Sequence, residues 1–327
     1  MITMNSRTDE ATSEKAGVHA VEFRDVCRSF GRGKDKTRAV DHLTLSIPRG
    51  SAYGLLGANG AGKTTSIRMM VAHLAPDAGT IRVLGEPPIA HDEPTRSKIA
   101  YISENMQIPH WLTLSEAAAL CAPLYPRWNG SLLEPLAKRF GLAMNRRYDE
   151  ASKGLRRAMC IILGLCQNAE LMILDEPASG LDTLARRDFL AEILDVVCDG
   201  NRTVVFSSHI LADIERIVDR VAILTSGRLI IEGELDALKE NVRRITLPKG
   251  AASEILPEKQ DLFKVLRTQR DEERSKWVVV DFTPEKLAAF LQKFDIADPE
   301  TVEVEGLNLE ELFVESVQSG DANRTER

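Results

Sequence analysis

Residues 57–65 have the residue types and the spacing of a phosphate-binding loop. They read Gly-Ala-Asn-Gly-Ala-Gly-Lys-Thr-Thr, with Gly57, Gly62, Lys63 and Thr64 at the offsets that such a loop requires. The glycines let backbone N–H groups turn inward and cradle phosphate oxygens. Lys63 would reach the β- and γ-phosphates, and the Thr64 hydroxyl would bind Mg²⁺. The predicted nucleotide-binding residues are Gly57, Ala58, Asn59, Gly60, Ala61, Gly62, Lys63, Thr64 and Thr65.

The segments on either side supply the strand and the helix that this loop needs. Residues 51–56 are apolar enough for a buried strand, and residues 66–72 can continue as a helix. The alternative is a glycine-rich turn without a ligand, which does not require these neighbours. The flanking pattern therefore favours a nucleotide site.

Two adjacent carboxylates end a second apolar run, Leu-Met-Ile-Leu-Asp-Glu at residues 171–176. A phosphate-binding loop that hydrolyses its nucleotide needs a carboxylate for Mg²⁺ and a group that activates water. Asp175 is the predicted Mg²⁺ partner, and Glu176 is placed to accept a proton from the attacking water. Without the upstream loop, the pair could equally be the end of an ordinary strand.

His209 follows the next apolar run, at residues 203–208. If both runs are parallel strands separated by a helix, His209 emerges at the same carboxyl edge of the sheet as Asp175 and Glu176. There it could donate a hydrogen bond to the γ-phosphate. A lone histidine after a strand is more often structural, so its catalytic role depends on that shared edge.

Composition limits the function classes. The chain has 327 residues and a formal net charge of −7, which gives no overall basic surface for nucleic acid. No apolar run approaches the roughly 18 residues of a membrane helix, and residues 1–17 lack the apolar core of a secretory signal. The five cysteines are odd in number and show no C-x-x-C pair, as expected for core residues in a reducing compartment. We expect a soluble cytosolic chain.

The surrounding pattern alternates strands with helices. A helical pattern covers residues 114–147, with capping-box spacing at Thr113 and Glu116 and again at Ser131 and Glu134. Further helices are expected near 184–197 and 211–218, and a hairpin around Ser226-Gly227. The predicted strands are 21–23, 43–47, 51–56, 80–84, 171–174, 203–208, 221–224 and 229–231.

Composition changes after Leu235. Residues 248–276 are charged and weakly periodic, a strand is predicted at 277–282, and helices are predicted near 284–294 and 309–317. The predicted divisions are a disordered tail (1–19), a nucleotide-binding domain (20–235), a small α+β accessory domain (236–318) and a polar tail (319–327).

The order of these motifs resembles the ATP-binding subunit of ABC transporters over about residues 20–235. Ser179-Gly-Leu-Asp182 follows the Leu-Asp-Glu run, and Ala151-Ser-Lys-Gly-Leu155 takes the place of the family's signature segment. The resemblance implies an α/β fold with an ABC-type P-loop ATPase core. That core has a mixed sheet, an antiparallel β subdomain and a helical subdomain at about 105–160, with the small C-terminal domain appended.

The resemblance also implies site roles. Phe30 aligns with the aromatic residue that stacks on adenine, and Glu104 stands where the family usually has a glutamine that senses Mg²⁺. Lys153 and Leu155 depart from the family's usual signature residues. The implied catalytic residues are Lys63, Glu176 and His209; the metal residues are Thr64, Asp175 and Glu104; the signature residues acting across a dimer are Ser152, Lys153 and Gly154; Asp182 would contact the partner protomer.

ATP and Mg²⁺ are the implied cofactors, and the implied partners are a second ABC ATPase subunit, identical or different, and a separate polytopic membrane subunit. Trp111 would lie where that subunit docks, and the expected location is the cytoplasmic face of the inner membrane. Residues 307–313, and residues 125–129 followed by 136–140, are similar to segments of bacterial exporter ATPases. One alternative is a soluble ABC ATPase that acts on ribosomes or DNA, although no nucleic-acid partner is expected. Another is a binding module that does not hydrolyse ATP.

Overall fold

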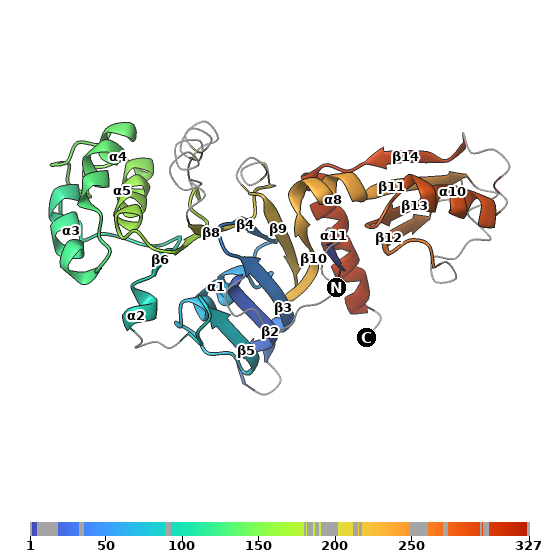
Figure 1. Ribbon diagram of the computed structural model, residues 1–327, viewed down its shortest axis with the longest axis horizontal. Helices are drawn as coiled ribbons and strands as arrows, with labels where there is room; N and C mark the ends of the chain where they lie inside the picture. Colours follow the sequence, from blue (N-terminus) through green and yellow to red (C-terminus); the bar gives the residue numbers. More distant parts are fainter. Residues whose placement is uncertain are drawn as a thin grey trace.

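The fold places a mixed sheet at the centre of the molecule, between a helical part and a C-terminal sheet (Figure 1). The computed structural model describes residues 2–4, 19–32, 36–88, 93–179, 181, 186, 190, 202–211, 215, 218–248, 261–270, 274–294, 296 and 301–325. The seven strands of the central sheet are, in spatial order, β1 (Ile2–Met4), β10 (Arg228–Glu234), β9 (Arg220–Thr225), β4 (Ala52–Leu56), β8 (Thr203–Ser208), β7 (Leu171–Asp175) and β6 (Ile99–Ile102).

Strands β9, β4, β8, β7 and β6 run parallel, whereas β10 pairs antiparallel with β9. The register places Leu56 beside Ser208 and Asp175 beside Ser207. The carboxyl ends of β4, β7 and β8 therefore meet at one edge of the sheet. This confirms the shared edge on which the interpretation of His209 depends.

The central strands are buried on both faces, as continuous apolar runs predict. Every residue of β7 and β8 is buried. Leu55 and Ile173 belong to the core on one face, and Leu56 and Leu174 to the core on the other, because successive side chains alternate. The sheet is thus a rigid base for the loops at its carboxyl edge.

A second, antiparallel sheet covers one side of the core. It consists of β3 (Thr37–Pro48), β2 (His19–Phe30) and β5 (Ala78–Val83), and β2 and β3 are longer than the sequence predicts. Helix α1 (Lys63–Met70) shares with this sheet the core cluster that contains Phe23, Leu45 and Ile67. The predicted antiparallel β subdomain is confirmed.

The helical part contains α3 (Leu114–Cys121), α4 (Leu133–Arg139) and α5 (Lys153–Cys166), with short helices α2 (Glu93–Arg96), η2 (Ala122–Leu124) and η3 (Gly130–Leu132). The predicted capping box at Thr113 and Glu116 is confirmed. The predicted cap at Ser131 is wrong. Asn129 instead accepts a hydrogen bond from the Ser131 backbone N–H, and α4 begins only at Leu133 without a side-chain cap. The Asn129 side chain, two residues before Ser131, makes the local bond instead.

The C-terminal part follows α8 (Leu235–Asn241). Its sheet has the order β12 (Val265–Arg270), β13 (Arg274–Val279), β11 (Arg243–Pro248) and β14 (Glu303–Gly306), with α10 (Pro284–Lys293) and α11 (Leu309–Thr325). Strand β12 falls in the segment of weak periodicity, and α11 runs on into the predicted polar tail. Ile2–Met4 form β1 beside β10, in the segment predicted as a disordered tail.

Among the helices in the part of the chain that the structure describes, none is long and apolar enough to cross a membrane. The predicted helices at 184–197 and 211–218 lie largely outside the described residues. Cys27, Cys121, Cys160 and Cys166 are free thiols, three of them buried, as the prediction of core cysteines requires. Cys198 is not described.

Candidate active site

The phosphate-binding loop links the end of β4 to the start of α1. Gly60 and Gly62 have φ angles of 81° and 105°, in the left-handed region that glycine adopts without strain. A Cβ at Gly62 would also lie 2.6 Å from the Ala39 carbonyl oxygen. The loop therefore requires glycine at position 62 for two separate reasons.

Lys63 and His209 both contact Glu176 at the carboxyl edge of the sheet. The buried Lys63 donates from Nζ to the Gly57 carbonyl oxygen at 2.7 Å and lies 3.4 Å from Glu176 Oε1. The other carboxylate oxygen, Oε2, is 2.9 Å from His209 Nδ1. The structure thus brings together the three residues that sequence analysis singles out for catalysis.

Glu176 has a backbone conformation unusual for a residue with a side chain. Its φ is 49°, and its N–H donates to the Ser207 carbonyl at 3.2 Å and to the Ser207 hydroxyl at 3.0 Å. Such strained backbone persists where the surroundings hold it, and it is concentrated at functional sites. Here it turns the chain at the end of β7 so that the carboxylate faces Lys63.

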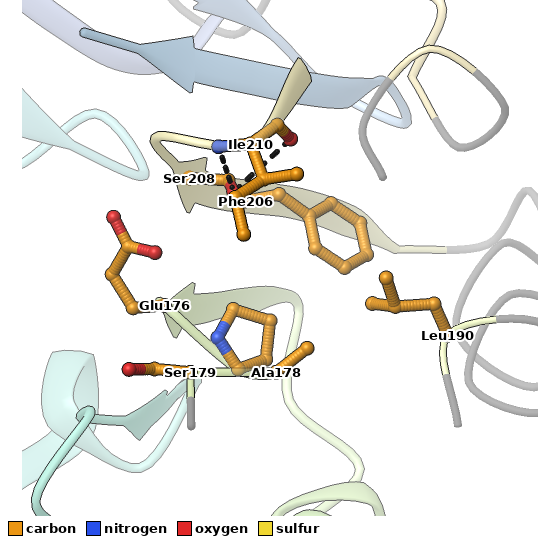
Figure 2. Close-up of a pocket in the computed structure, with 8 residues that line it drawn as sticks. Glu176, Ala178, Ser179, Leu190, Phe206, Ser208 and Ile210 are labelled. Atoms are coloured by element: carbon orange, nitrogen blue, oxygen red, sulfur yellow. Dashed lines mark hydrogen bonds between the residues drawn. The ribbon is translucent and has the colours of Figure 1, made fainter. Parts of the chain in front are cut away.

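The turn that presents His209 is closed by its neighbour Ser208. The Ser208 hydroxyl accepts from the Ile210 N–H at 2.9 Å and lies 3.2 Å from the Ile210 carbonyl oxygen. Figure 2 shows this turn above Glu176, beside a largely apolar hollow to which Phe206 and Leu190 contribute. The histidine is therefore held by the turn as well as by Glu176.

Asp175 lies in a buried network next to the loop. Its Oδ1 accepts from the Ser207 hydroxyl at 2.6 Å and from the Thr64 hydroxyl at 3.4 Å. Burial and the neighbouring Asp175 carboxylate raise the pKa of Tyr101 to about 12, so this phenol stays protonated. Ser207 and Tyr101 are residues that sequence analysis misses.

The Thr64 and Asp175 oxygens fit the donor set that Mg²⁺ takes at nucleotide sites. Mg²⁺ prefers hard oxygen ligands and is held there by one or two protein groups together with substrate phosphates. Asp175 is 2% exposed, and its described hydrogen bonds come from neutral hydroxyl groups. A buried carboxylate of this kind suits a divalent cation.

One cleft collects most of the predicted residues. Its lining includes Phe30 at 43% exposure, Glu104, Glu176 and His209. Glu104 Oε1 accepts from the Ser179 hydroxyl at 2.8 Å. The phosphate-binding loop lines the same cleft with Ala58, Asn59, Gly60, Ala61, Gly62, Lys63, Thr64 and Thr65.

Thr37, Arg38 and Ser226 also line this cleft, although sequence analysis does not single them out as site residues. Arg38 precedes the loop by many residues and carries no motif of its own. Pairing of β2 with β3 brings it beside Ser29, next to Phe30. Only the sheet register could have predicted its place.

The signature residues lie elsewhere on the protomer. Ser152 caps α5 by accepting from the Leu155 N–H at 3.3 Å, and Lys153 lines a separate hollow with Glu104. Ser152, Lys153 and Gly154 are absent from the lining of the cleft that holds the phosphate-binding loop. Asp182 lies outside the described residues.

Comparisons with known proteins decide the family. A family model described as ABC transporter matches residues 40–179. The daunorubicin/doxorubicin resistance ATP-binding protein of Streptomyces peucetius is 35% identical over 64% of this chain and 66% of that protein. The Nod factor export ATP-binding protein I of Paraburkholderia xenovorans is 33% identical over 67% of this chain and 72% of that protein. The chain belongs to the family of ABC transporter ATP-binding proteins.

A solved structure of an ATP-binding subunit of an ABC transporter agrees with this assignment. It is 30% identical, covers 68% of this chain and 92% of the solved chain, and superposes with a TM-score of 0.59. The ABC-type P-loop ATPase core predicted from the sequence is confirmed. The chain is therefore an ATP-binding ABC ATPase.

Within this ABC ATPase, Arg157 makes five hydrogen bonds that sequence analysis does not predict. Its guanidinium donates to the carbonyl oxygens of Ser103 at 2.6 Å, Glu104 at 2.9 Å, Asp175 at 3.2 Å, Glu176 at 2.9 Å and Pro177 at 2.8 Å. The sequence does not reveal the role of Arg157, because all its partners are backbone carbonyl oxygens of residues distant in the chain.

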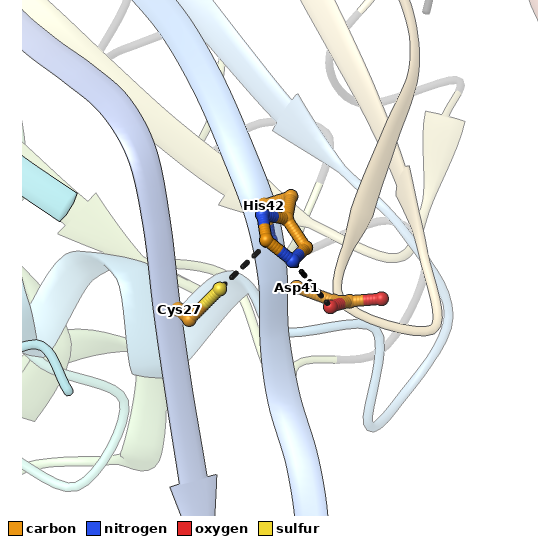
Figure 3. A group of neighbouring side chains, drawn as sticks. All are labelled: Cys27, Asp41 and His42. Atoms are coloured by element: carbon orange, nitrogen blue, oxygen red, sulfur yellow. Dashed lines mark hydrogen bonds and ion pairs between the residues drawn. The ribbon is translucent and has the colours of Figure 1, made fainter. Parts of the chain in front are cut away.

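Cys27, Asp41 and His42 form a cluster whose donor atoms are close enough to suggest a metal site (Figure 3). Asp41 is however paired with Arg38 Nη1 at 2.6 Å and with Arg228 Nε at 2.5 Å. Burial opposes ionisation of Asp41, but the two arginines outweigh it and the pKa of the carboxyl is lowered. The carboxylate is already neutralised by cations, so the cluster gives no support for a metal.

Proposed function

We propose that this ABC ATPase hydrolyses ATP in the described cleft as the energy-supplying subunit of an exporter. The observation that carries the proposal is the Glu176 carboxylate, which lies between Lys63 and His209 beside the phosphate-binding loop. A base held next to a phosphate-binding lysine is what hydrolysis of the terminal phosphate requires.

The catalytic roles follow from these contacts. Lys63 exchanges the Gly57 carbonyl oxygen for phosphate oxygens when ATP enters, and Glu176 accepts the proton of the attacking water. His209 Nδ1 lies 2.9 Å from Glu176 Oε2, which leaves its Nε2 for the γ-phosphate. Phe30, at the edge of the cleft, offers its exposed ring to adenine.

Thr64 and Asp175 would hold Mg²⁺, and Glu104 faces the same cleft as a further carboxylate. When bound, Mg²⁺ neutralises charge on the phosphate oxygens. Ser207 keeps Asp175 in place and also receives the Glu176 N–H. One hydroxyl thereby positions the metal ligand and the base together.

The proposal includes a dimer. Ser152, Lys153 and Gly154 lie outside the lining of their own protomer's cleft, so they would serve the cleft of a second ABC ATPase subunit, identical or different. Asp182 is proposed as a contact between protomers. ATP bound between the two protomers would favour the closed state, and hydrolysis would release it.

The names of two relatives support the exporter role, and an exposed residue of the helical part supports the membrane partner. The two relatives named above are, by name, a drug-resistance and a Nod factor export protein, which favours a transporter over a soluble ATPase that acts on ribosomes or DNA. Trp111 is 68% exposed on the helical part, where it would meet a separate polytopic membrane subunit. We place the chain at the cytoplasmic face of the membrane.

The experiment is a steady-state ATPase assay of Glu176→Gln. Removal of the base should lower kcat by about 10²–10⁴-fold while ATP binding is retained, because the amide cannot accept the proton. Glu170→Gln is the matched control. Glu170 precedes the opposite end of β7, pairs with Arg127 at 2.7 Å, and should leave kcat unchanged. Undiminished hydrolysis by Glu176→Gln would exclude Glu176 as the base.

A further inference from the structure

Arg157 connects three separate parts of the protomer through one planar group. It belongs to α5, its Nη1 reaches the carbonyls of Ser103 and Glu104, and its Nε and Nη2 reach the turn after β7. The two loops that carry Glu104 and Glu176 are therefore fastened to the same helix. That helix begins at Lys153 and is capped by Ser152.

Arginine is the side chain suited to this position. Its guanidinium carries five N–H donors in a rigid fork, whereas lysine has three donors on a single atom. The five acceptors are carbonyl oxygens from two loops, spread around the plane of the group. An ammonium at the same place could reach only some of them.

The unusual backbone at Glu176 is part of the same arrangement. In an extended strand successive carbonyls point to opposite sides, but the carbonyls of Asp175 and Glu176 both accept from Nη2 of Arg157. The φ of 49° at Glu176 is what breaks the alternation. The guanidinium therefore compensates for the strain that turns the base toward Lys63.

We propose that Arg157 is a positioning residue, which fixes Glu176 relative to the Glu104 loop and to the signature helix. This inference rests on the proposed function, because it assigns Arg157 a part in ATP hydrolysis. Ser152 lies at the start of α5 and Arg157 within its second turn, so a movement of the signature segment reaches both loops directly. When the dimer closes, a contact made by Ser152 would therefore also position Glu176, the base of the same protomer, in the turn after β7.

The chain supplies a matched control on the same helix. Arg156 donates to the carbonyls of Tyr148 at 2.9 Å and Asp149 at 2.7 Å, inside the helical part and away from β7. Arg156→Lys therefore makes the same chemical change without touching the Glu176 turn. Arg157→Gln is a second test variant, which keeps hydrogen-bonding groups but removes the charge, for use if Arg157→Lys does not fold.

The experiment combines amide hydrogen exchange of the full chain with steady-state ATP hydrolysis. Arg157→Lys should raise exchange in residues 103–106 and 175–179 together, and lower kcat about tenfold or more with KM for ATP changed less than about threefold. Arg156→Lys should raise exchange in neither segment and keep kcat within about twofold of the original.

Unchanged exchange in either segment of Arg157→Lys would overturn the proposal, as would the same loss of kcat in Arg156→Lys. A parallel change in kcat and KM would also overturn it, because that pattern indicates general disruption of the fold. If exchange rises in both segments of Arg157→Lys but the unmodified chain hydrolyses no ATP, the proposed function is wrong. The conclusion that Arg157 holds the two loops together is then still supported.

Discussion

At the scale of single residues, the site depends on side chains that hold others in place. Ser207 is completely buried and joins the Asp175 carboxylate to the Glu176 backbone. Tyr101 and Arg157 flank the same turn. The groups that touch ATP in our proposal are therefore oriented by a surrounding set of hydroxyls and one guanidinium, as preorganised catalysis requires.

Tyr101 gives a prediction about alkaline pH. Its pKa is about 12 in the folded chain because it is buried beside Asp175, whereas an unfolded tyrosine titrates near pH 10. Between these values the unfolded state releases the proton and the folded state keeps it, so stability falls as pH rises. Tyr101→Phe should remove this contribution.

The measurement is urea unfolding of both chains from about pH 9 to about pH 11. The free energy of unfolding of the original chain should decline relative to that of Tyr101→Phe across this range. The other tyrosines titrate in both chains, so the difference isolates Tyr101. A difference that stays constant with pH would show that the Tyr101 pKa is not raised.

The residues of the site differ in how far the sequence predicts their places. The placement of Lys63, Asp175 and Glu176 in one region was predictable from local motif spacing, and that of His209 because two parallel strands end at one edge. Ser207, Tyr101 and Arg157 were not, since each acts through a contact between segments far apart in the chain. Register and packing create such contacts, and no local motif marks them.

At the scale of elements, the junction between β4 and α1 depends on two glycines with different constraints. Both Gly60 and Gly62 have a positive φ. A Cβ at Gly60 would meet nothing within 4 Å, whereas one at Gly62 would meet the Ala39 carbonyl at 2.6 Å. The two positions therefore separate backbone strain from steric overlap.

Gly62→Ala should cost about 2–4 kcal/mol of stability, and Gly60→Ala about 1–2 kcal/mol, because only the first adds an overlap to the cost of a left-handed residue. Urea unfolding without nucleotide measures both. Equal losses would mean that β3 moves freely away from the loop and that position 62 is not constrained by Ala39.

Helices and strands were predicted best where the sequence has a clear hydrophobic pattern or capping box. The apolar runs of β7 and β8 and the capping box of α3 all have the predicted places. Strand β12 (Val265–Arg270) alternates too weakly to be recognised, because its sheet packs on a small core formed by Trp277, Phe263 and Phe290. Residues 265–270 therefore form a strand because they pair with β13, and not because of their own hydrophobic pattern.

At the scale of the whole molecule, the C-terminal part is joined firmly to the ATPase core. Leu309 and Leu312 of α11 belong to the same hydrophobic cluster as Ile223 and Ile231 of the central sheet. Glu315 of α11 also pairs with Arg244 at 2.9 Å and Arg267 at 2.6 Å. The helix thus links the C-terminal sheet to β9 and β10.

This arrangement leaves the opposite end of the molecule available for a partner. Trp111, Leu120 and Leu124 are exposed apolar residues of the helical part, which lies at the other end from the C-terminal sheet (Figure 1). Because α5 and Arg157 connect this part to Glu176, a partner bound there would be mechanically linked to the nucleotide site.

The central claim is that ATP binding by this chain acts on a separate membrane subunit. We would purify the Glu176→Gln variant from gently solubilised native membranes in ATP and in ADP, and identify its companions by mass spectrometry. A polytopic membrane protein in stoichiometric amount, retained in ATP, is the predicted result. Recovery of ribosomes, of nucleic-acid proteins or of the chain alone would contradict the account.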